Sequence, residues 1–119
     1  MVVVSRVKTS ADQRIAYIED FFPAGLVTIE ELEANFKGSV LDFFIERGDP
    51  SIDYAWADIQ ALHAGKLLAE KLSVPEDAII FLAEETLFSK AGTPFEFSLN
   101  YMLMEFFKFH IIRTIPGSS

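Results

Sequence analysis

Turn signals recur at short intervals along this chain, and they limit how long any helix or strand can be. Pro23, Gly48, Pro75 and Gly92 each interrupt an apolar run, since proline cannot continue a helix and glycine adopts turn conformations at little cost. No internal repeat, low-complexity tract or block of like charge divides the sequence further. The sequence therefore predicts a single domain, residues 1–119, built from short elements.

The runs between these signals have the patterns of an α+β domain. β-branched or alternating apolar residues predict six strands, at residues 2–9, 15–22, 52–62, 78–89, 95–103 and 107–115. Capping residues Thr28 and Ser39 open two short helices, at residues 28–35 and 39–48, and a third helix is predicted at 64–72. Tight turns join at least two of the strand pairs. We therefore predict a six-stranded antiparallel β-sheet flanked by short helices.

Composition and charge exclude several classes of protein. Half of the 119 residues are hydrophobic and twelve are Phe, which is typical of a chain that folds around a core. The net charge of −8 argues against direct, nonspecific binding of nucleic acid. The chain has no Cys, so disulfides and thiol catalysis are excluded. The three valines near Met1 are too few for a signal peptide or a membrane span, and we expect a cytoplasmic protein with no membrane partner.

Residues with obvious catalytic potential are scarce. His63 and His110 are far apart and have no metal-site spacing with carboxylates. The sequence has neither a glycine-rich phosphate loop nor a Gly-x-Ser-x-Gly motif. We therefore expect no catalytic residue, no metal site and no cofactor.

Two features suggest a site for an anion. Arg6 and Lys8 are two residues apart on a predicted strand, so their side chains leave the same face. They form either a solvated strand face or a clamp for a carboxylate or phosphate. Ser39 is either a simple helix cap or part of a helix N-terminus that binds an anion. If these residues converge, they would bind a small anionic molecule.

A polar stripe lies on the fifth predicted strand. Glu96, Ser98 and Asn100 share one face, and the alternate residues share the other: Phe95, Phe97, Leu99 and Tyr101. The simplest interpretation of the polar stripe is the wet face of an antiparallel sheet. The alternative is a set of hydrogen-bonding groups for a ligand.

The order and spacing of motifs over about a hundred residues resemble the UTRA domain, the effector-binding module of HutC-type GntR transcription regulators in bacteria. Three stretches carry the resemblance: SRVKTSADQRIAYIEDFFP, SVLDFFIERG, and ALHAGKLLAEKLSVPEDAIIFLAEETLFSKAGTPFEFS. No single motif is specific. The resemblance implies a chorismate-lyase-like fold that forms homodimers and binds a small anionic or polar metabolite.

The resemblance also implies roles for particular residues. Arg6 and Lys8 fall where relatives often have two arginines that contact an anionic group of the effector. Ser39 matches the serine that opens a helix, Glu96 matches the glutamate of the fifth strand, and Tyr101 lies near the end of that strand. Nothing in the sequence resembles the winged helix-turn-helix domain of such regulators. We expect the chain to be the effector-binding part of a larger protein that contacts DNA through a separate domain.

Four positions differ from the family pattern. Lys8 replaces an Arg, and Ile18 stands where many relatives have Glu. Leu41 and Met102 stand where relatives often have Tyr. The differences predict a more apolar pocket and argue against a sugar phosphate as the effector.

Two other functions fit the same residues. One is a chorismate-lyase-like enzyme that would use Arg6 and a carboxylate such as Glu96 on a small carboxylate substrate. The other is a structural dimerisation module whose pocket binds nothing.

Overall fold

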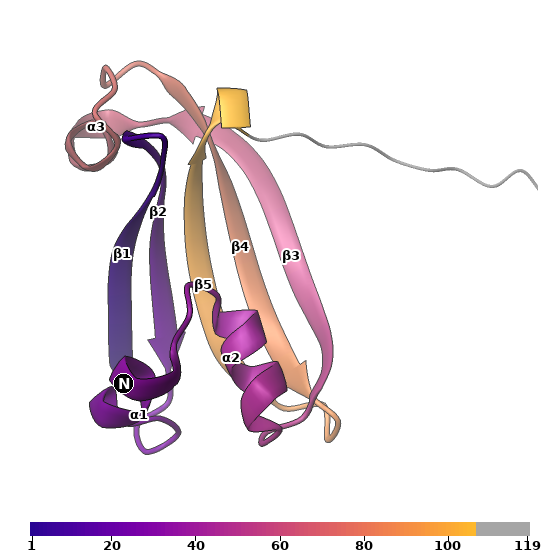
Figure 1. Cartoon of the computed structure of the whole chain (residues 1–119). Coiled ribbons are helices and arrows are strands. Elements are labelled where there is room, and N and C mark those ends of the chain that lie inside the picture. Colours follow the sequence, from indigo (N-terminus) through magenta and orange to yellow (C-terminus); the bar gives the residue numbers. More distant parts are fainter. Residues whose placement is uncertain (107–119) are drawn as a thin grey trace, which may run out of the picture.

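The antiparallel sheet predicted from the sequence is present, with the strand order β1-β2-β5-β4-β3 (Figure 1). The structure is a computed structural model and describes residues 1–106. The strands are β1 (Val2–Ser10), β2 (Gln13–Phe22), β3 (Ile52–His63), β4 (Ile79–Ser89) and β5 (Pro94–Leu103). The helices are α1 (Ile29–Asn35), α2 (Val40–Arg47) and α3 (Gly65–Leu72), and a 3-10 turn at Met104–Phe106 follows β5. The prediction of an α+β domain is confirmed.

Within residues 1–106 the sheet has five strands, where the sequence predicted six over the whole chain. The sixth predicted strand, residues 107–115, lies outside the described residues, as do Phe107, Phe109 and His110. None of the helices in the described part of the chain is long and apolar enough to cross a membrane.

A two-residue turn sets the register between β1 and β2. Ser10 pairs with Gln13, which leaves Ala11 and Asp12 in the turn with φ angles of 49° and 64°. Positive φ at both positions is what a type I′ hairpin turn requires. With this turn and a register shift after Lys8, Arg6 lies opposite Ile18.

The caps of the first two helices were predicted correctly. Thr28 Oγ1 accepts a hydrogen bond from the backbone N–H of Glu31 at 3.0 Å, and Ser39 Oγ accepts one from that of Asp42 at 3.2 Å. Gly48, with φ of 76°, ends α2 in the left-handed conformation that glycine adopts without strain. Local side-chain chemistry therefore determines where α1 and α2 begin and where α2 ends.

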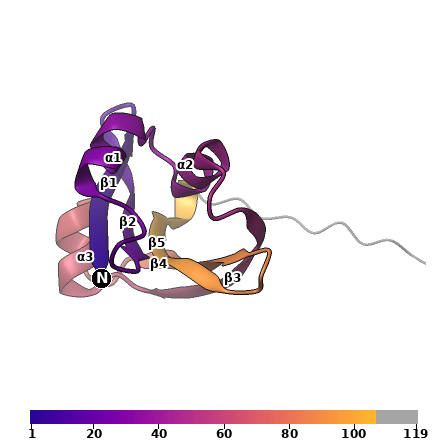
Figure 2. The same ribbon diagram turned by 90° about the horizontal axis from the view of Figure 1, so that it is seen from below.

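The sheet is strongly bent, and the helices lie on both of its faces. Seen from below, β1 and β2 stand upright, β3 and β4 lie across, and α2 occupies the inside of the bend (Figure 2). Helix α3 packs on the opposite side, beside β1 and β2 (Figure 2). We call the side towards α2 the inner face and the side towards α3 the outer face.

Each face of the sheet has its own hydrophobic core. The inner core contains Phe22, Val27, Val40, Phe43, Phe44, Leu87 and Phe95. The outer core contains Tyr17, Ala64, Leu68, Leu72, Ile80 and Leu103. Phe44 of α2 has no exposed surface, and its ring centroid lies 5.0 Å from that of Phe95 and 5.9 Å from that of Phe22. Aromatic packing thus holds α2 against the sheet.

One predicted alternation on β5 is wrong at its start. Leu87 pairs with Glu96 but Phe88 pairs with Pro94, so the register shifts and Phe95 is left without an opposite residue. Such a β-bulge places two successive side chains on the same face. Phe95 therefore joins the inner core beside Phe44 and does not share a face with Phe97.

Replacing Phe44 by Ala is expected to lower the free energy of unfolding by about 3–5 kcal/mol, because the missing ring leaves a cavity in the inner core. Urea unfolding followed by circular dichroism measures this change. Ile45→Ala is the control, since Ile45 is the next residue of α2 and is 63% exposed; its effect should stay within about 0.5 kcal/mol. Similar losses in both variants would contradict the assigned packing of α2.

Candidate functional site

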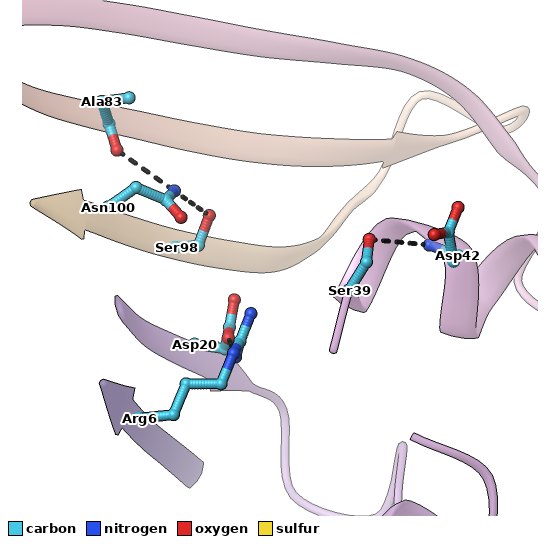
Figure 3. Close-up of polar contacts among 7 residues, drawn as sticks. All are labelled: Arg6, Asp20, Ser39, Asp42, Ala83, Ser98 and Asn100. Atoms are coloured by element: carbon cyan, nitrogen blue, oxygen red, sulfur yellow. Dashed lines mark hydrogen bonds and ion pairs between the residues drawn. The ribbon is translucent and has the colours of Figure 1, made fainter. Parts of the chain in front are cut away.

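A polar cavity of about 190 Å³ lies on the inner face, between strands β1, β2, β4 and β5 and the start of α2 (Figure 3). Five side chains with ionisable groups line it: Arg6, Lys8, Asp20, Glu85 and Glu96. The rest of its lining includes Ile18, Ser39, Val40, Leu41, Leu87, Ser98 and Asn100. The structure therefore brings together Arg6, Lys8, Ser39 and Glu96, which the sequence singled out, and adds Ser98 and Asn100 of the predicted polar stripe.

Strand alternation and register explain why these side chains meet. Asp20 of β2 pairs with Ser98 of β5, and Ser98 pairs with Glu85 of β4. Glu96 is two residues before Ser98, so both side chains point to the inner face. The predicted shared face of Glu96 and Ser98 is confirmed.

The interpretation of this polar stripe as a wet face is wrong. Glu96 and Ser98 are each only 4% exposed, whereas Phe97, on the other face, is 37% exposed. The polar side of β5 is covered because it faces into the bend of the sheet that α2 occupies (Figure 2). Buried polar groups need hydrogen-bond partners. The polar groups of Glu96 and Ser98 lie in the wall of the cavity.

Arg6 forms an ion pair with Asp20 in this wall (Figure 3). The guanidinium donates to Asp20 Oδ2, and its Cζ lies 4.9 Å from the ring centroid of Phe36. Asp20 is only 2% exposed, and a carboxylate buried this deeply needs a cation beside it. Arg6 is therefore not the unpaired cation that the clamp interpretation assumed.

Two carboxylates of the cavity, Asp20 and Glu85, were not predicted from the sequence. Asp20 interrupts an apolar strand two residues after Ile18, and Glu85 precedes Leu87 by two residues. Each thus alternates in step with an inward-facing apolar residue. This two-residue spacing from an inward-facing apolar residue is the sequence signal that places both carboxylates on the inner face. They also make the cavity more acidic than the apolar pocket expected from Ile18 and Leu41.

Glu96 is held in its protonated form. Burial, a hydrogen bond with the Asp20 carboxylate, and the charges of Asp20 and Glu85 raise its pKa to about 9, and the opposing charge of Arg6 does not offset them. One oxygen, Oε1, has no hydrogen-bond partner among residues 1–106. Burial and the charge of Asp20 also raise the pKa of Glu85. The cavity thus contains a neutral carboxylic acid with an unused acceptor.

The remaining polar groups differ in how fully they are engaged. Asn100 Nδ2 donates to Ser98 Oγ at 3.1 Å and to the Ala83 carbonyl at 3.4 Å (Figure 3). Ser39 caps α2 and lines the cavity at the same time. Lys8 is exposed and has no ion pair within residues 1–106. Lys8 is therefore the free cation of the cavity in the described structure.

Tyr101 lies away from the cavity, on the outer face. Its ring centroid is 6.2 Å from that of Tyr17, and it packs against the outer core. The physical reason is strand alternation, because Tyr101 is five residues from Glu96 and so points to the opposite face. His63, to which we assigned no role, is exposed, and its Nδ1 lies 3.1 Å from the carbonyl of Asp77.

Comparison of the sequence with protein families finds a match that covers most of the chain. The family model of the UTRA domain matches residues 1–108. A search of the curated proteins finds no match.

Solved structures with the same fold come from bacterial transcription regulators. PhnF from Mycobacterium smegmatis has a TM-score of 0.80 at 16% identity, over 94% of this chain and 49% of PhnF. The effector domain of PhnF alone has a TM-score of 0.79 at 16% identity, over 95% of this chain and 69% of that domain. The ligand-binding domain of a putative GntR-family regulator from Bordetella bronchiseptica has a TM-score of 0.76 at 17% identity, over 94% and 73%. At these identities the similarity shows a shared fold.

The raised pKa of Glu96 predicts a specific pH dependence of stability. Because the folded protein holds this proton up to about pH 9 and the unfolded chain loses it near pH 4.5, the unfolded state binds fewer protons in between. Stability should therefore fall as pH rises from about 5 to 8, by up to about 1.4 kcal/mol per pH unit from this group.

Glu96→Gln mimics the protonated acid and should lack this contribution. Urea unfolding of both proteins at pH 5, 6, 7 and 8 measures the difference, which should grow with pH in favour of the variant. Parallel stability curves for the two proteins would contradict the assignment of a neutral Glu96.

Proposed function

Since this chain belongs to the UTRA domain family, we propose that it is the effector-binding domain of a bacterial GntR-type transcription regulator, of the HutC subfamily. The observation that carries this proposal is the inner-face cavity, which gathers Lys8, Ser39 and Glu96 between the sheet and α2. Structural neighbours described as effector and ligand-binding domains support it.

The effector we propose is a small anionic or polar metabolite that contacts the sheet and α2 together. Lys8 and Glu96 belong to the sheet, whereas Ser39 begins α2. A ligand between them adds contacts that exist only when α2 holds one position relative to the sheet. A ligand shifts a conformational equilibrium only through such differential contacts.

We propose that the domain works as a homodimer and transmits ligand binding to DNA binding. An effector that favours one arrangement of the dimer would change operator affinity through a coupling of about 1–3 kcal/mol. Strand β3 is at the edge of the sheet formed by residues 1–106, and its aromatic residues Tyr54 and Trp56 are 47% and 61% exposed, which supports a contact between subunits.

DNA itself is contacted, in this proposal, by a separate winged-helix domain of a cytoplasmic protein. The net charge of −8 disfavours contact between this chain and the phosphate backbone of DNA. The match to PhnF supports this division, because the chain spans about half of that regulator.

Lys8→Ala is expected to weaken effector binding about tenfold or more, because a hydrogen bond to a charged group contributes about 1.5–3 kcal/mol. Sugar phosphates, amino acids and carboxylates are screened by thermal shift, and affinity for each stabilising compound is measured by calorimetry. Lys8 is chosen over Arg6 because Arg6→Ala would leave Asp20 buried without its partner.

Lys66→Ala is the matched control, since Lys66 is an exposed lysine of α3, on the other side of the sheet. It should bind the compound as the unaltered protein does. Equal binding by the Lys8 and Lys66 variants would contradict the assignment of the cavity as the effector-binding site. A screen with no stabilising compound would favour a purely structural dimerisation module.

We propose that the domain is not an enzyme, and the neutral Glu96 makes this worth testing directly. A buried carboxylic acid beside Arg6 is also what a general acid in a chorismate-lyase-like reaction would need. Incubation with chorismate should yield no 4-hydroxybenzoate above the uncatalysed rate, as followed by chromatography. Product formation that Glu96→Gln abolishes would replace the effector-binding proposal with an enzymatic one.

A further inference from the structure

The arginine that an anionic ligand would need in this cavity already has an anion beside it. The guanidinium of Arg6 donates to Asp20 Oδ2, and both side chains line the cavity (Figure 3). The ring centroid of Phe36 lies 4.9 Å from the Cζ of Arg6, over one side of the guanidinium. Asp20 thus acts as an internal anion for Arg6.

An anionic ligand cannot take the place of Asp20 without a large loss. Asp20 is only 2% exposed, so an anion that drew Arg6 away would leave a buried carboxylate without a cation. Such an unpaired buried charge is strongly unfavourable. An anion that left the ion pair intact would meet a guanidinium whose charge is already balanced. In both cases Arg6 adds little to the binding of an anion.

Two further carboxyl groups disfavour an anion near these residues. Ser98 pairs with Asp20 on one side and with Glu85 on the other, so the three side chains share the inner face. Carboxylates on both sides of Ser98 repel an anion that enters between them. Asp42, in the first turn of α2, offsets the positive end of the helix beside Ser39. An anion is therefore disfavoured both at the sheet and at the start of α2.

The groups of the cavity that remain available suit an uncharged polar molecule. Glu96 is only 4% exposed, and its Oε1 has no hydrogen-bond partner among residues 1–106. A hydroxyl or an amide N–H of a ligand can donate to this oxygen, and buried polar atoms nearly always have a partner. Lys8, Ser98 and Asn100 also line the cavity and can donate to a hydroxyl or a carbonyl. A neutral ligand uses these groups without adding a charge to the cavity.

We propose that Asp20 is a specificity-determining residue, through which the cavity selects a small uncharged polar molecule, such as a sugar, a polyol or an amide, over the corresponding anion. The proposal rests on the cavity being the effector site. A volume of about 190 Å³ is below the range of roughly 300–1,000 Å³ typical of drug-sized ligands, which favours a small molecule. An amine gains no advantage either, because Arg6 and Lys8 line the same cavity.

Matched compounds test the selectivity of the unaltered protein. Hexoses, glycerol and myo-inositol are compared by thermal shift with their phosphate esters, nicotinamide with nicotinate, and glucose with glucosamine. At least one neutral compound should raise Tm where its charged counterpart at the same concentration does not. If only charged compounds stabilise the protein, or both members of each pair do so equally, the role of Asp20 is wrong while the effector-binding function stands. If no compound of any class stabilises it, both proposals fail.

Asp20→Asn tests the residue itself, with the best neutral compound and its anionic counterpart. The variant keeps the shape of the side chain and an acceptor for Arg6, but no carboxylate then balances the guanidinium. Calorimetry should show that the anion binds this variant at least about tenfold more tightly than it binds the unaltered protein, the effect of one hydrogen bond to a charged group. If Asp20→Asn does not fold, the compound pairs still decide whether the cavity excludes anions.

Two further variants separate the role of Asp20 from a general effect of charge. Arg6→Gln combined with Asp20→Asn should lose the gain in anion binding, because that gain depends on the freed guanidinium. Glu84→Gln is the matched control, because it removes a carboxylate from β4 on the outer face, and it should leave the selectivity unchanged. Circular dichroism checks that each variant is folded. Unchanged selectivity in folded Asp20→Asn, or the same change in Glu84→Gln, would overturn the proposal.

Discussion

The ion pair between Arg6 and Asp20 is the interaction on which the inner face depends. Asp20 is 2% exposed within an otherwise apolar strand, and loss of its cationic partner would cost about 3–5 kcal/mol. The pair allows a charge to lie inside the bend of the sheet. Asp20 in turn accepts a hydrogen bond from Glu96 and helps to keep it neutral. The cavity is therefore one electrostatic unit, and its state is decided by groups from β1, β2, β4 and β5.

The inner face has an apolar part, which packs against α2, and a polar part, which lines the cavity. The inner core around Phe44 holds α2 against the part of the sheet that is lower in Figure 1. The cavity lies where the same helix begins, at Ser39. The aromatic packing of the inner core thus adjoins the cavity wall, in which Glu96 Oε1 has no hydrogen-bond partner among residues 1–106. In the proposed function, this arrangement lets the domain keep its fold while a ligand contacts both α2 and the sheet.

Local signals predicted the elements, and long-range contacts account for what was missed. Ser39 is recognisable as a cap because its bond spans three residues. The alternation that joins Glu96 to its neighbours on β5 is visible in the sequence, but which face is covered depends on where α2 packs. The pairing of Arg6 with Asp20 depends on a two-residue turn and a register shift. Phe95 faces inward because of a bulge set by β4.

The central claim is that Glu96 is a neutral acid placed to receive the effector. Carbon-13 NMR of the glutamate side-chain carboxyls over a pH titration measures this directly. The account predicts that the Glu96 carboxyl titrates near pH 9. Titration of Glu96 near its ordinary value of 4.5 would contradict it.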